Sequence, residues 1–502
     1  MSRKTKKETP KADTQEQMFA RLKSLLSEDQ LILLHEELEQ PNYPALRINP
    51  LKIARDGVID EWSQRYNWEY KKVPYCPTGY WITQSPLPIS KTIEHSLGHY
   101  YIQDAASMLP AELFHFENFP NPIILDMAAS PGGKTTHIVS RTLDRGLVIA
   151  NDSSRERLTA LRIVLQNWGN THSAISNYPG EYFGSWFPQM FDAILLDAPC
   201  SMQGLRESDA HSLKPITQKE INTLARRQIR LLESAIHALK PNGEVVYSTC
   251  TLTFEENEAV LDAVLQRFGT IISIEPLTDI LTIPAPALIG TESNQFNSQI
   301  ANAARLWPHI YGTAGFFAAR IHKTGSTLIA NTAAPSRPLS QAGWFPLEQN
   351  LIDCINASIA AIYGIEFKQI LDENDLVVWR FKNACHLFPK LFLDKLPDFP
   401  VQALGLPFGQ FNGDSFELSH EFASRFGERA IGQVYVVNEE QLSLWMYGHD
   451  LNLGHLPQTN SPIWIIRDQL NRTLGVGKYT SGRLRNMLPR RAMISGQIAQ
   501  RF

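Results

Sequence analysis

Hydrophobic residues between about positions 121 and 322 fall into short apolar runs that alternate with segments of helical period. The runs are continuous, which is typical of parallel strands that are buried on both faces. Because helical segments with one apolar face separate these runs, the pattern predicts a doubly wound α/β fold. The predicted strands are 122–127, 146–151, 191–197, 243–249 and 315–323, and the predicted helices are 134–143, 154–168, 217–239 and 255–268.

The chain on either side of this unit is less regular. Two helical stretches, about 16–27 and 29–39, precede a strand-like segment at 44–53. Ser, Thr, Ala and Pro dominate residues 324–343, which predicts a linker. We therefore expect a basic arm at 1–15, an N-terminal domain at 16–110, an α/β domain at 111–323, the linker at 324–343, an α+β domain at 344–455 and a basic segment at 456–502.

Composition narrows the class of protein. With 43% hydrophobic and 20% charged residues, the chain has ample material for buried cores. A formal net charge of −4 excludes a globally basic nucleic-acid coat protein but leaves room for local basic patches. The five cysteines include no CxxC pair, which favours reduced thiols in a cytoplasmic protein. No apolar stretch approaches the length of a membrane span, so we expect no membrane partner.

Both ends of the chain are basic. The first fifteen residues carry five cations and one acid, which is typical of a solubilising tail or of an electrostatic contact with RNA. No acid follows position 471, so the C-terminal cations predict a phosphate-binding surface, with an ordinary solvated tail as the alternative. These cations are Arg472, Lys478, Arg483, Arg485, Arg490, Arg491 and Arg501.

The loop after the first predicted strand, DMAASPGGKTT (126–136), lies where doubly wound sheets bind ligands. Its GKT tripeptide fits the second half of a phosphate-binding P-loop, but Ala128 stands where that motif needs its first glycine. A turn that approaches a nucleoside cofactor is favoured instead, because the loop is built of small residues. Asp152, at the end of the second strand, is then the candidate acceptor for ribose hydroxyls.

Two cysteines follow two different strands. Cys200 lies in DAPCS (197–201) and Cys250 lies in STCT (248–251). A single cysteine is usually a small buried hydrophobe, but the carboxyl ends of neighbouring parallel strands converge on one crevice. Two thiols there indicate thiol chemistry, since helix N-termini and cations favour a thiolate. No further ligands have zinc-site spacing, so we expect no metal.

With these motifs the chain resembles the NOL1/NOP2/Sun family of RNA cytosine-5 methyltransferases, and within it the bacterial F-type enzymes that act on small-subunit ribosomal RNA. Residues 475–486 resemble the tail of the F-type enzymes, which ends in a PUA-like RNA-binding module. The other matching segments are YIQDAASMLPA (101–111), ILDMAASPGGKTTHI (124–138), FDAILLDAPCS (191–201), VYSTCTLTFEENEAV (246–260) and RLWPHIYGTAGFFAAR (305–320).

The resemblance implies a Rossmann-like core that uses S-adenosylmethionine and forms 5-methylcytosine. Cys250 matches the nucleophile that adds to C6 of cytosine. Asp197 matches the residue near N3, and Cys200 matches the cysteine that assists removal of the C5 proton and release of the enzyme. The cofactor-binding residues implied are Ala128, Ala129, Ser130, Pro131, Gly132, Gly133, Lys134, Asp152, Pro179 and Asp197.

The implied partner is RNA, namely a cytosine of 16S ribosomal RNA in the 30S subunit, bound by a cytoplasmic monomer. The N-terminal domain and the PUA-like C-terminal segment would bind RNA, since a base inside structured RNA must be extruded to reach a pocket. The candidate RNA-binding residues are Arg47, Lys478, Arg483 and Arg485. A transfer RNA cytosine remains an alternative substrate.

Three positions depart from the family pattern. Pro179 stands where the family has an aspartate that contacts adenine. Met202 replaces a glycine that permits positive φ. LRESDA (205–210) replaces a basic segment. These departures keep open a second function, a catalytically weakened RNA-binding factor in ribosome assembly.

Overall fold

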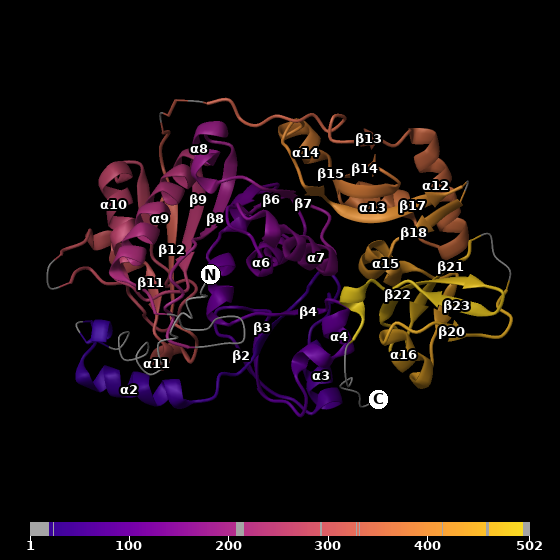
Figure 1. Cartoon of the computed structure of the whole chain (residues 1–502), viewed down its shortest axis with the longest axis horizontal. Coiled ribbons are helices and arrows are strands. Elements are labelled where there is room, and N and C mark those ends of the chain that lie inside the picture. The colour runs from indigo at the N-terminus through magenta and orange to yellow at the C-terminus, as the bar shows by residue number, and fades with distance from the viewer. Residues whose placement is uncertain are drawn as a thin grey trace, which may run out of the picture.

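The structure is a computed structural model that describes residues 20–494, apart from residue 24 and the segments 207–214, 292–293, 328, 331, 414 and 458–460. Its central sheet has the order β10-β12-β9-β8-β5-β6-β7-β16 (Figure 1). The strands β5 to β9 are parallel, and β10 and β12 are antiparallel. These strands are β5 (Ile123–Asp126), β6 (Leu147–Asn151), β7 (Ser173–Ser176), β8 (Phe191–Asp197), β9 (Leu239–Thr249), β10 (Ile272–Glu275), β12 (Phe316–Lys323) and β16 (Ala403–Leu404).

Helices cover both faces of this sheet, which confirms the predicted doubly wound fold. Side chains that alternate along β5 enter different cores: Ile124 packs in the cluster that contains Ile138 of α6, whereas Leu125 packs in the cluster that contains Leu232 of α9. Burial on both faces is why these strands are continuous apolar runs in the sequence. The helices are α6 (Gly133–Arg141), α7 (Leu158–Trp168), α8 (Phe183–Trp186), α9 (Gln218–Ala238) and α10 (Glu258–Phe268).

The strand order reverses beside β5. From β5 the chain adds β6 and β7 on one side, and then adds β8 and β9 on the other. The loops that follow β5 and β8 therefore diverge at the point where open α/β sheets form a crevice. The loop that follows β9 lies next to the loop that follows β8, because Asp197 pairs with Ser248.

The N-terminal domain forms a separate sheet in the order β2-β3-β1-β4, below the central sheet in Figure 1. Helix α2 packs its leucines against Leu252 and Trp307 of the central domain. The elements are α2 (Glu28–Glu39), β1 (Ala45–Ile48), α3 (Val58–Tyr66), β2 (Glu69–Lys72), β3 (Gly79–Gln84), α4 (Ile93–Ser96), β4 (Tyr100–Ile102) and α5 (Leu109–Glu112). Later in the chain, α11 (Pro308–Tyr311) lies against α2, and β11 (Ala304–Leu306) pairs with β12 of the central sheet. The predicted arm at 1–15 lies outside the described residues.

Arg47 corrects one prediction. Its side chain is fully buried and lies over the ring of Trp168. The guanidinium donates to Gln103, Ser140 and Thr136, and to the carbonyl oxygen of Gly133. Because its donors are used inside the protein, Arg47 fastens the N-terminal domain to α6, and the prediction that it contacts RNA is wrong for this structure.

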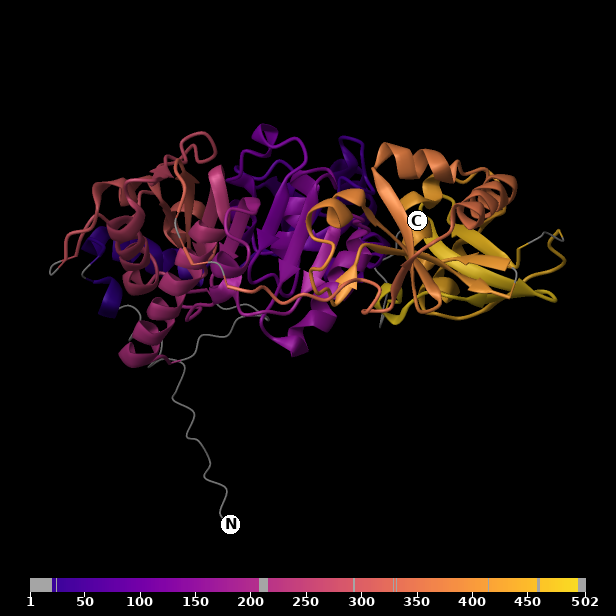
Figure 2. The ribbon, with the colours of Figure 1, turned by 90° about the horizontal axis from the view of Figure 1, so that it is seen from above.

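Two further sheets follow the linker and lie at one end of the elongated molecule, as Figure 2 shows from above. The first contains β13 (Trp344–Pro346), β14 (Leu376–Phe381), β15 (Ala384–Pro389), β17 (Leu406–Asn412) and β18 (Ser415–Leu418), with α12 (Gln349–Tyr363), α13 (Phe367–Glu373) and α14 (Lys390–Lys395). The second contains β19 (Val434–Val436), β20 (Leu451–Asn452), β21 (Ile463–Arg467), β22 (Thr473–Thr480) and β23 (Arg483–Asn486), with α15 (His420–Phe426) and α16 (Glu439–Met446) nearby.

The predicted boundary between residues 455 and 456 does not match these sheets. Strands β19 and β20 precede it but pair with β21 and β23. The basic segment at the C-terminus therefore completes a sheet that begins near residue 434. Strand β16 pairs with β7, so the region after the linker also extends the central sheet. Among the described helices, none combines the length and the apolar character that crossing a bilayer requires.

Candidate active site at the strand ends

The structure brings the two strand-end cysteines together. Cys200 follows β8, Cys250 follows β9, and their Sγ atoms lie 3.3 Å apart. Both cysteines are partly exposed. The hydrogen bond to Cys250, burial and the charge of Cys250 raise the pKa of Cys200 well above its usual value. Two thiols at this distance share one proton more readily than they ionise together.

A lysine–aspartate pair lies beside the cysteines. Lys134 Nζ donates to Asp197 Oδ2 at 2.8 Å and to Ser107 Oγ at 2.7 Å, and Ser248 Oγ donates to Asp197 Oδ1 at 2.8 Å. Burial lowers the pKa of Lys134, but the charges of Asp197 and Cys250 raise it above its usual value. The resemblance named both Lys134 and Asp197 as site residues but gave no role to the two serines, although both serines stand in the matched motifs.

The loop after β5 is tightly packed. Gly132 has a φ of +116°, which favours glycine, and a Cβ atom there would lie 3.0 Å from Val164. A Cβ atom on Gly133 would lie 2.9 Å from the ring of Tyr101. The two glycines therefore make room for α7 and for Tyr101, and the loop from Ala128 to Lys134 turns sharply into α6. Such a turn suits a nucleoside cofactor that must approach closely.

Asp126, at the carboxyl end of β5, is a site residue that sequence reasoning did not single out. Its side chain is buried, and Oδ2 accepts a hydrogen bond of 2.6 Å from Thr135, whereas Oδ1 has no partner. Burial raises its pKa to about 7, and the charge of Asp197 acts in the same direction. An unpartnered buried carboxylate oxygen fits the positively charged part of S-adenosylmethionine, so the residues present suit this cofactor.

Asp152 and Pro179 flank the same loop. The carboxylate of Asp152 accepts from Ser130 N at 3.1 Å and from Ser154 N at 2.8 Å, which braces the cofactor loop. Pro179 is exposed and offers no side-chain hydrogen bond. Asn177 lies nearby but donates to the backbone oxygen of Asp152 at 2.6 Å. A role of Asp152 in binding ribose stays a prediction.

The loop after Cys200 keeps the backbone shape that glycine would give. Met202 adopts a φ of +59° although it carries a side chain. A Cβ atom on Gly204 would lie 2.7 Å from the carbonyl oxygen of Gly315 and 3.0 Å from that of Cys250. Arg206 donates to the carbonyl oxygen of Glu37 in α2 at 2.8 Å. Residues 207–210, the rest of the departing segment, lie outside the described residues.

A cavity of about 440 Å³ lies next to both cysteine loops. Its lining includes Gln203 and Leu205 from one loop and Leu252 and Phe254 from the other. The remaining walls come from residues 20–25 and from the start of α9. Neither cysteine is among the lining residues, so this cavity is beside the reaction site rather than part of it.

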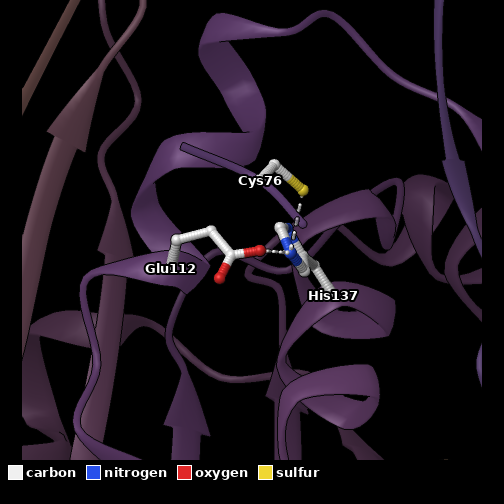
Figure 3. Close-up of side chains that lie close together, drawn as sticks. All are labelled: Cys76, Glu112 and His137. Atoms are coloured by element: carbon white, nitrogen blue, oxygen red, sulfur yellow. Dashed lines mark hydrogen bonds and ion pairs between the residues drawn. The ribbon is translucent and has the colours of Figure 1, made fainter. Parts of the chain in front are cut away.

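A second cluster of titratable side chains includes His137 of α6, where Cys76, Glu112 and His137 point toward one another (Figure 3). His137 Nε2 lies 2.8 Å from Glu112 Oε1 and 3.8 Å from Cys76 Sγ. Burial lowers the pKa of His137 to about 4 and raises that of Cys76 to about 12. Arg141 pairs with Glu112, and the charge of Arg47 acts on His137. A metal cation would be repelled by both arginines, so we interpret the cluster as a structural joint.

The C-terminal cations have partners from other parts of the chain. Lys478 pairs with Glu417 at 2.8 Å, and Arg483 pairs with Asp450 at 2.6 Å. Other pairs in this region are Arg472 with Glu94 and Asp468, and Arg491 with Glu421. Arg501 lies outside the described residues. The prediction of seven uncompensated charges is therefore wrong, because folding supplies acids that the local sequence lacks.

Arg483, Arg485 and Arg490 of this segment are exposed, and among the described residues Arg485 and Arg490 form no ion pair. Arg485 lies on β23, opposite Lys478 of β22. Arg485 and Arg490 are therefore the best placed of the described C-terminal cations to contact a phosphate group.

Comparison with known proteins identifies the family. The profile of the 16S rRNA methyltransferase RsmB/F family matches residues 115–322. That of the N-terminal domain of 16S rRNA methyltransferase RsmF matches residues 15–105. Ribosomal RNA small subunit methyltransferase F of Aeromonas salmonicida is 33% identical over 456 residues, which cover 90% of this chain and 91% of the relative. The protein of the same name from Pectobacterium atrosepticum is 32% identical and covers 92% of each chain.

Solved structures agree with this assignment. A methyltransferase homologue from Pyrococcus horikoshii is 32% identical, has a TM-score of 0.54, and covers 63% of this chain and 99% of its own. NSun6 from the same organism, solved with SFG, has a TM-score of 0.52 at 23% identity, with 62% of this chain and 98% of its own covered, and thus supports the fold alone. The chain therefore belongs to the RsmB/F family and is an RNA methyltransferase that uses S-adenosylmethionine.

Proposed function

We propose that this protein methylates C5 of a cytosine in 16S ribosomal RNA, with Cys250 as the nucleophile. The observation that carries the proposal is the pair of sulfur atoms 3.3 Å apart, next to the Lys134–Asp197 pair. A cytosine ring is too electron-poor at C5 to be alkylated directly. Addition of a thiolate to C6 pushes electrons to C5 and makes it a nucleophile.

The cofactor loop, Asp126 and Asp152 would hold S-adenosylmethionine at the carboxyl end of β5. When bound, this cofactor supplies an electrophilic methyl group. The unpartnered Oδ1 of Asp126 suits its positive charge. Gly132 and Gly133 let the loop pack closely against Val164 and Tyr101, which sets its path at the strand end.

Asp197 would act near N3 of the cytosine, as the family resemblance implies. Thiolate addition builds negative charge on the ring, and a hydrogen bond or proton at N3 stabilises that charge. Lys134 and Ser248 fix both oxygens of the Asp197 side chain, so its orientation is set before substrate binds. The side chain keeps 30% exposure, which leaves it accessible to a base.

Cys200 would act after the methyl group has been transferred. Once Cys250 is bonded to C6, its negative charge is gone, and Cys200 gives up its proton to solvent water more easily, which leaves a thiolate as the base. Cys200 can then take the proton from C5, and the electrons of that C–H bond form the C5–C6 double bond as the Cys250 thiolate leaves. The enzyme is released with both sulfurs in their starting positions.

The substrate is inferred from the relatives. Proteins named ribosomal RNA small subunit methyltransferase F match 90% of the chain, which supports 16S ribosomal RNA in the 30S subunit as the target. We propose that a cytoplasmic monomer binds it, with Arg485 and Arg490 near the phosphate backbone.

Methylation of defined substrates tests this function. Purified protein should transfer tritiated methyl groups from S-adenosylmethionine to 30S subunits lacking the modification, and bisulfite sequencing should locate them at a 16S cytosine. Methyl transfer to free transfer RNA alone would show that the substrate is transfer RNA and not 16S ribosomal RNA. Absence of any transfer, with no saturable cofactor binding by calorimetry, would favour the alternative assembly factor, which the left-handed Met202 and the exposed Pro179 keep in view.

A further inference from the structure

One buried carboxylate joins the two cysteine loops. Glu256, in the short 3-10 helix Phe254–Glu256 after Cys250, has no exposed surface. Its Oε2 accepts from Ser201 N at 3.0 Å, and its Oε1 accepts from Ser201 Oγ. Thr253 Oγ1 donates to Oε1 at 2.8 Å. The Glu256 side chain thus bonds both to Ser201, which follows Cys200, and to Thr253, which lies three positions after Cys250.

Residues of α9 and β9 also bond to Glu256. Gln228 Nε2, on α9, donates to Oε2 at 2.9 Å and to the carbonyl oxygen of Pro199 at 2.9 Å. Tyr247, on β9, donates to the backbone oxygen of Glu256 at 2.5 Å. Ser201, Thr253 and Gln228 all donate to the Glu256 carboxylate, so both carboxylate oxygens act as acceptors.

The charge of Glu256 is not neutralised. No ion pair joins it to a cation within the described ranges, whereas the neighbouring Glu258 pairs with the buried Arg305. Its negative charge acts on Cys200 and is one of the causes of the high pKa of that thiol, after the hydrogen bond to Cys250, burial and the charge of Cys250. On the other side of the pair, Lys134 interacts with the charge of Cys250.

We propose that Glu256 is a positioning residue that fixes the distance between the two sulfurs and keeps Cys200 as the thiol of the pair, leaving Cys250 as the thiolate. The anion stands on the Cys200 side and the cation Lys134 stands on the Cys250 side. This arrangement selects the nucleophile before substrate arrives. The inference rests on the proposed function, since it assigns a division of labour to the same two cysteines.

Selective alkylation of the full-length protein tests the proposal without cofactor or RNA. Iodoacetamide reacts with thiolates, and peptide mass spectrometry reports Cys200 and Cys250 separately at pH values from about 6 to about 10. In the wild type, Cys250 should react first and Cys200 only at higher pH. Equal rates at the two cysteines throughout the range would overturn the proposal.

Glu256→Gln removes the charge while keeping the size of the side chain. The rate at Cys200 should rise roughly three- to tenfold at a fixed pH, as expected when the pKa of a thiol falls by half a unit to one unit. Glu256→Asp keeps the charge and should retain the preference for Cys250, even if both rates change. An increase at Cys200 that is the same in Glu256→Asp as in Glu256→Gln would show that the residue acts only through packing and would overturn the electrostatic role.

Glu255→Gln is the matched control, because Glu255 is adjacent but bonds to Gln218 and not to Ser201. It should leave both alkylation rates unchanged.

Methyl transfer by Glu256→Gln should fall about tenfold in kcat with little change in KM, since the residue does not touch RNA. If the alkylation pattern is as expected but neither the wild type nor any variant methylates RNA, the proposed function fails while the role of Glu256 stands. If Glu256→Gln does not fold, Glu256→Asp still decides the question: the proposal requires it to keep the wild-type order of alkylation, and loss of that order while the charge is present would overturn the electrostatic role.

Discussion

The strand-end crevice and the basic C-terminal sheet differ in how their functional residues are assembled. In the crevice, Cys200, Cys250 and Asp197 converge because parallel strands must end at one edge. In the C-terminal sheet, the cations come from adjacent positions of the chain, but acids from distant segments pair with several of them. Topology makes the first site readable from sequence, whereas surface charge depends on partners that only folding reveals.

The largest expected effect is at the nucleophile. Cys250→Ala should reduce methyl transfer by at least about 10³-fold, because no other group can add to C6. Cofactor binding should be unchanged by calorimetry, since Cys250 is not part of the loop after β5. Cys354→Ala is the control, because that cysteine is exposed on α12. Methyl transfer at the wild-type rate by Cys250→Ala would show that the reaction does not take place in this crevice.

Asp126 offers a pH-dependent test of the cofactor side of the crevice. Its pKa is about 7 in the folded protein against a usual value of 3.8. A carboxyl whose pKa rises on folding makes the folded state bind more protons, so stability falls as pH rises between these two values and then levels off. Asp126→Asn removes this cost, and its gain in stability over the wild type should grow across the same range to at most about 4 kcal/mol.

Thermal melting of the cofactor-free protein at several pH values measures this difference. S-adenosylmethionine should stabilise the wild type more than Asp126→Asn above pH 7, because the positive charge of the cofactor loses its carboxylate partner in the variant. Parallel pH profiles for the two proteins would mean that Asp126 stays ionised in the fold.

The C-terminal surface should respond more weakly. Arg485→Gln combined with Arg490→Gln should lower RNA affinity and reduce the slope of log affinity against log salt by about 1.4 to 1.8, the value for two phosphate contacts. Arg380→Gln combined with Lys382→Gln changes the same charge on an exposed hairpin of the other C-terminal sheet. An equal effect of both pairs would indicate a general charge effect and no defined contact. Removal of 460–502 is unsuitable as a test, since it deletes β21, β22 and β23.

The smallest effect is expected at Met202. A residue with a side chain at φ +59° is strained by about 1 kcal/mol, which glycine relieves at the cost of greater freedom in the unfolded chain. Met202→Gly should therefore change stability by less than about 1 kcal/mol and methyl transfer by less than about threefold. A large gain in activity would identify Met202 as the cause of a weakened enzyme.

Sequence alone predicted β5, β6, β8, β9 and β12 and the helices α6, α7, α9 and α10 within a few residues, because apolar runs and helical periods are strong there. It missed the short elements β7, β10, β11 and α8. It also predicted that Cys200, Cys250, Asp197 and Lys134 would share a site. It did not predict Glu256 or Asp126 as parts of that site, since a buried carboxylate has no local pattern that separates it from a surface one. The prediction that Arg47 contacts RNA was wrong for the same reason, because the burial of Arg47 depends on contacts with α6 about 90 positions away.

Covalent trapping measures the central claim most directly. Cys200→Ser should accumulate a protein–RNA adduct when incubated with unmethylated 16S ribosomal RNA and cofactor, because the C5 proton is no longer removed and Cys250 stays attached to C6. The adduct should appear as a slower band on a denaturing gel, and the double variant Cys200→Ser, Cys250→Ala should show none. A band of equal strength in the double variant, or none in the single one under conditions where wild type methylates the RNA, would contradict the account.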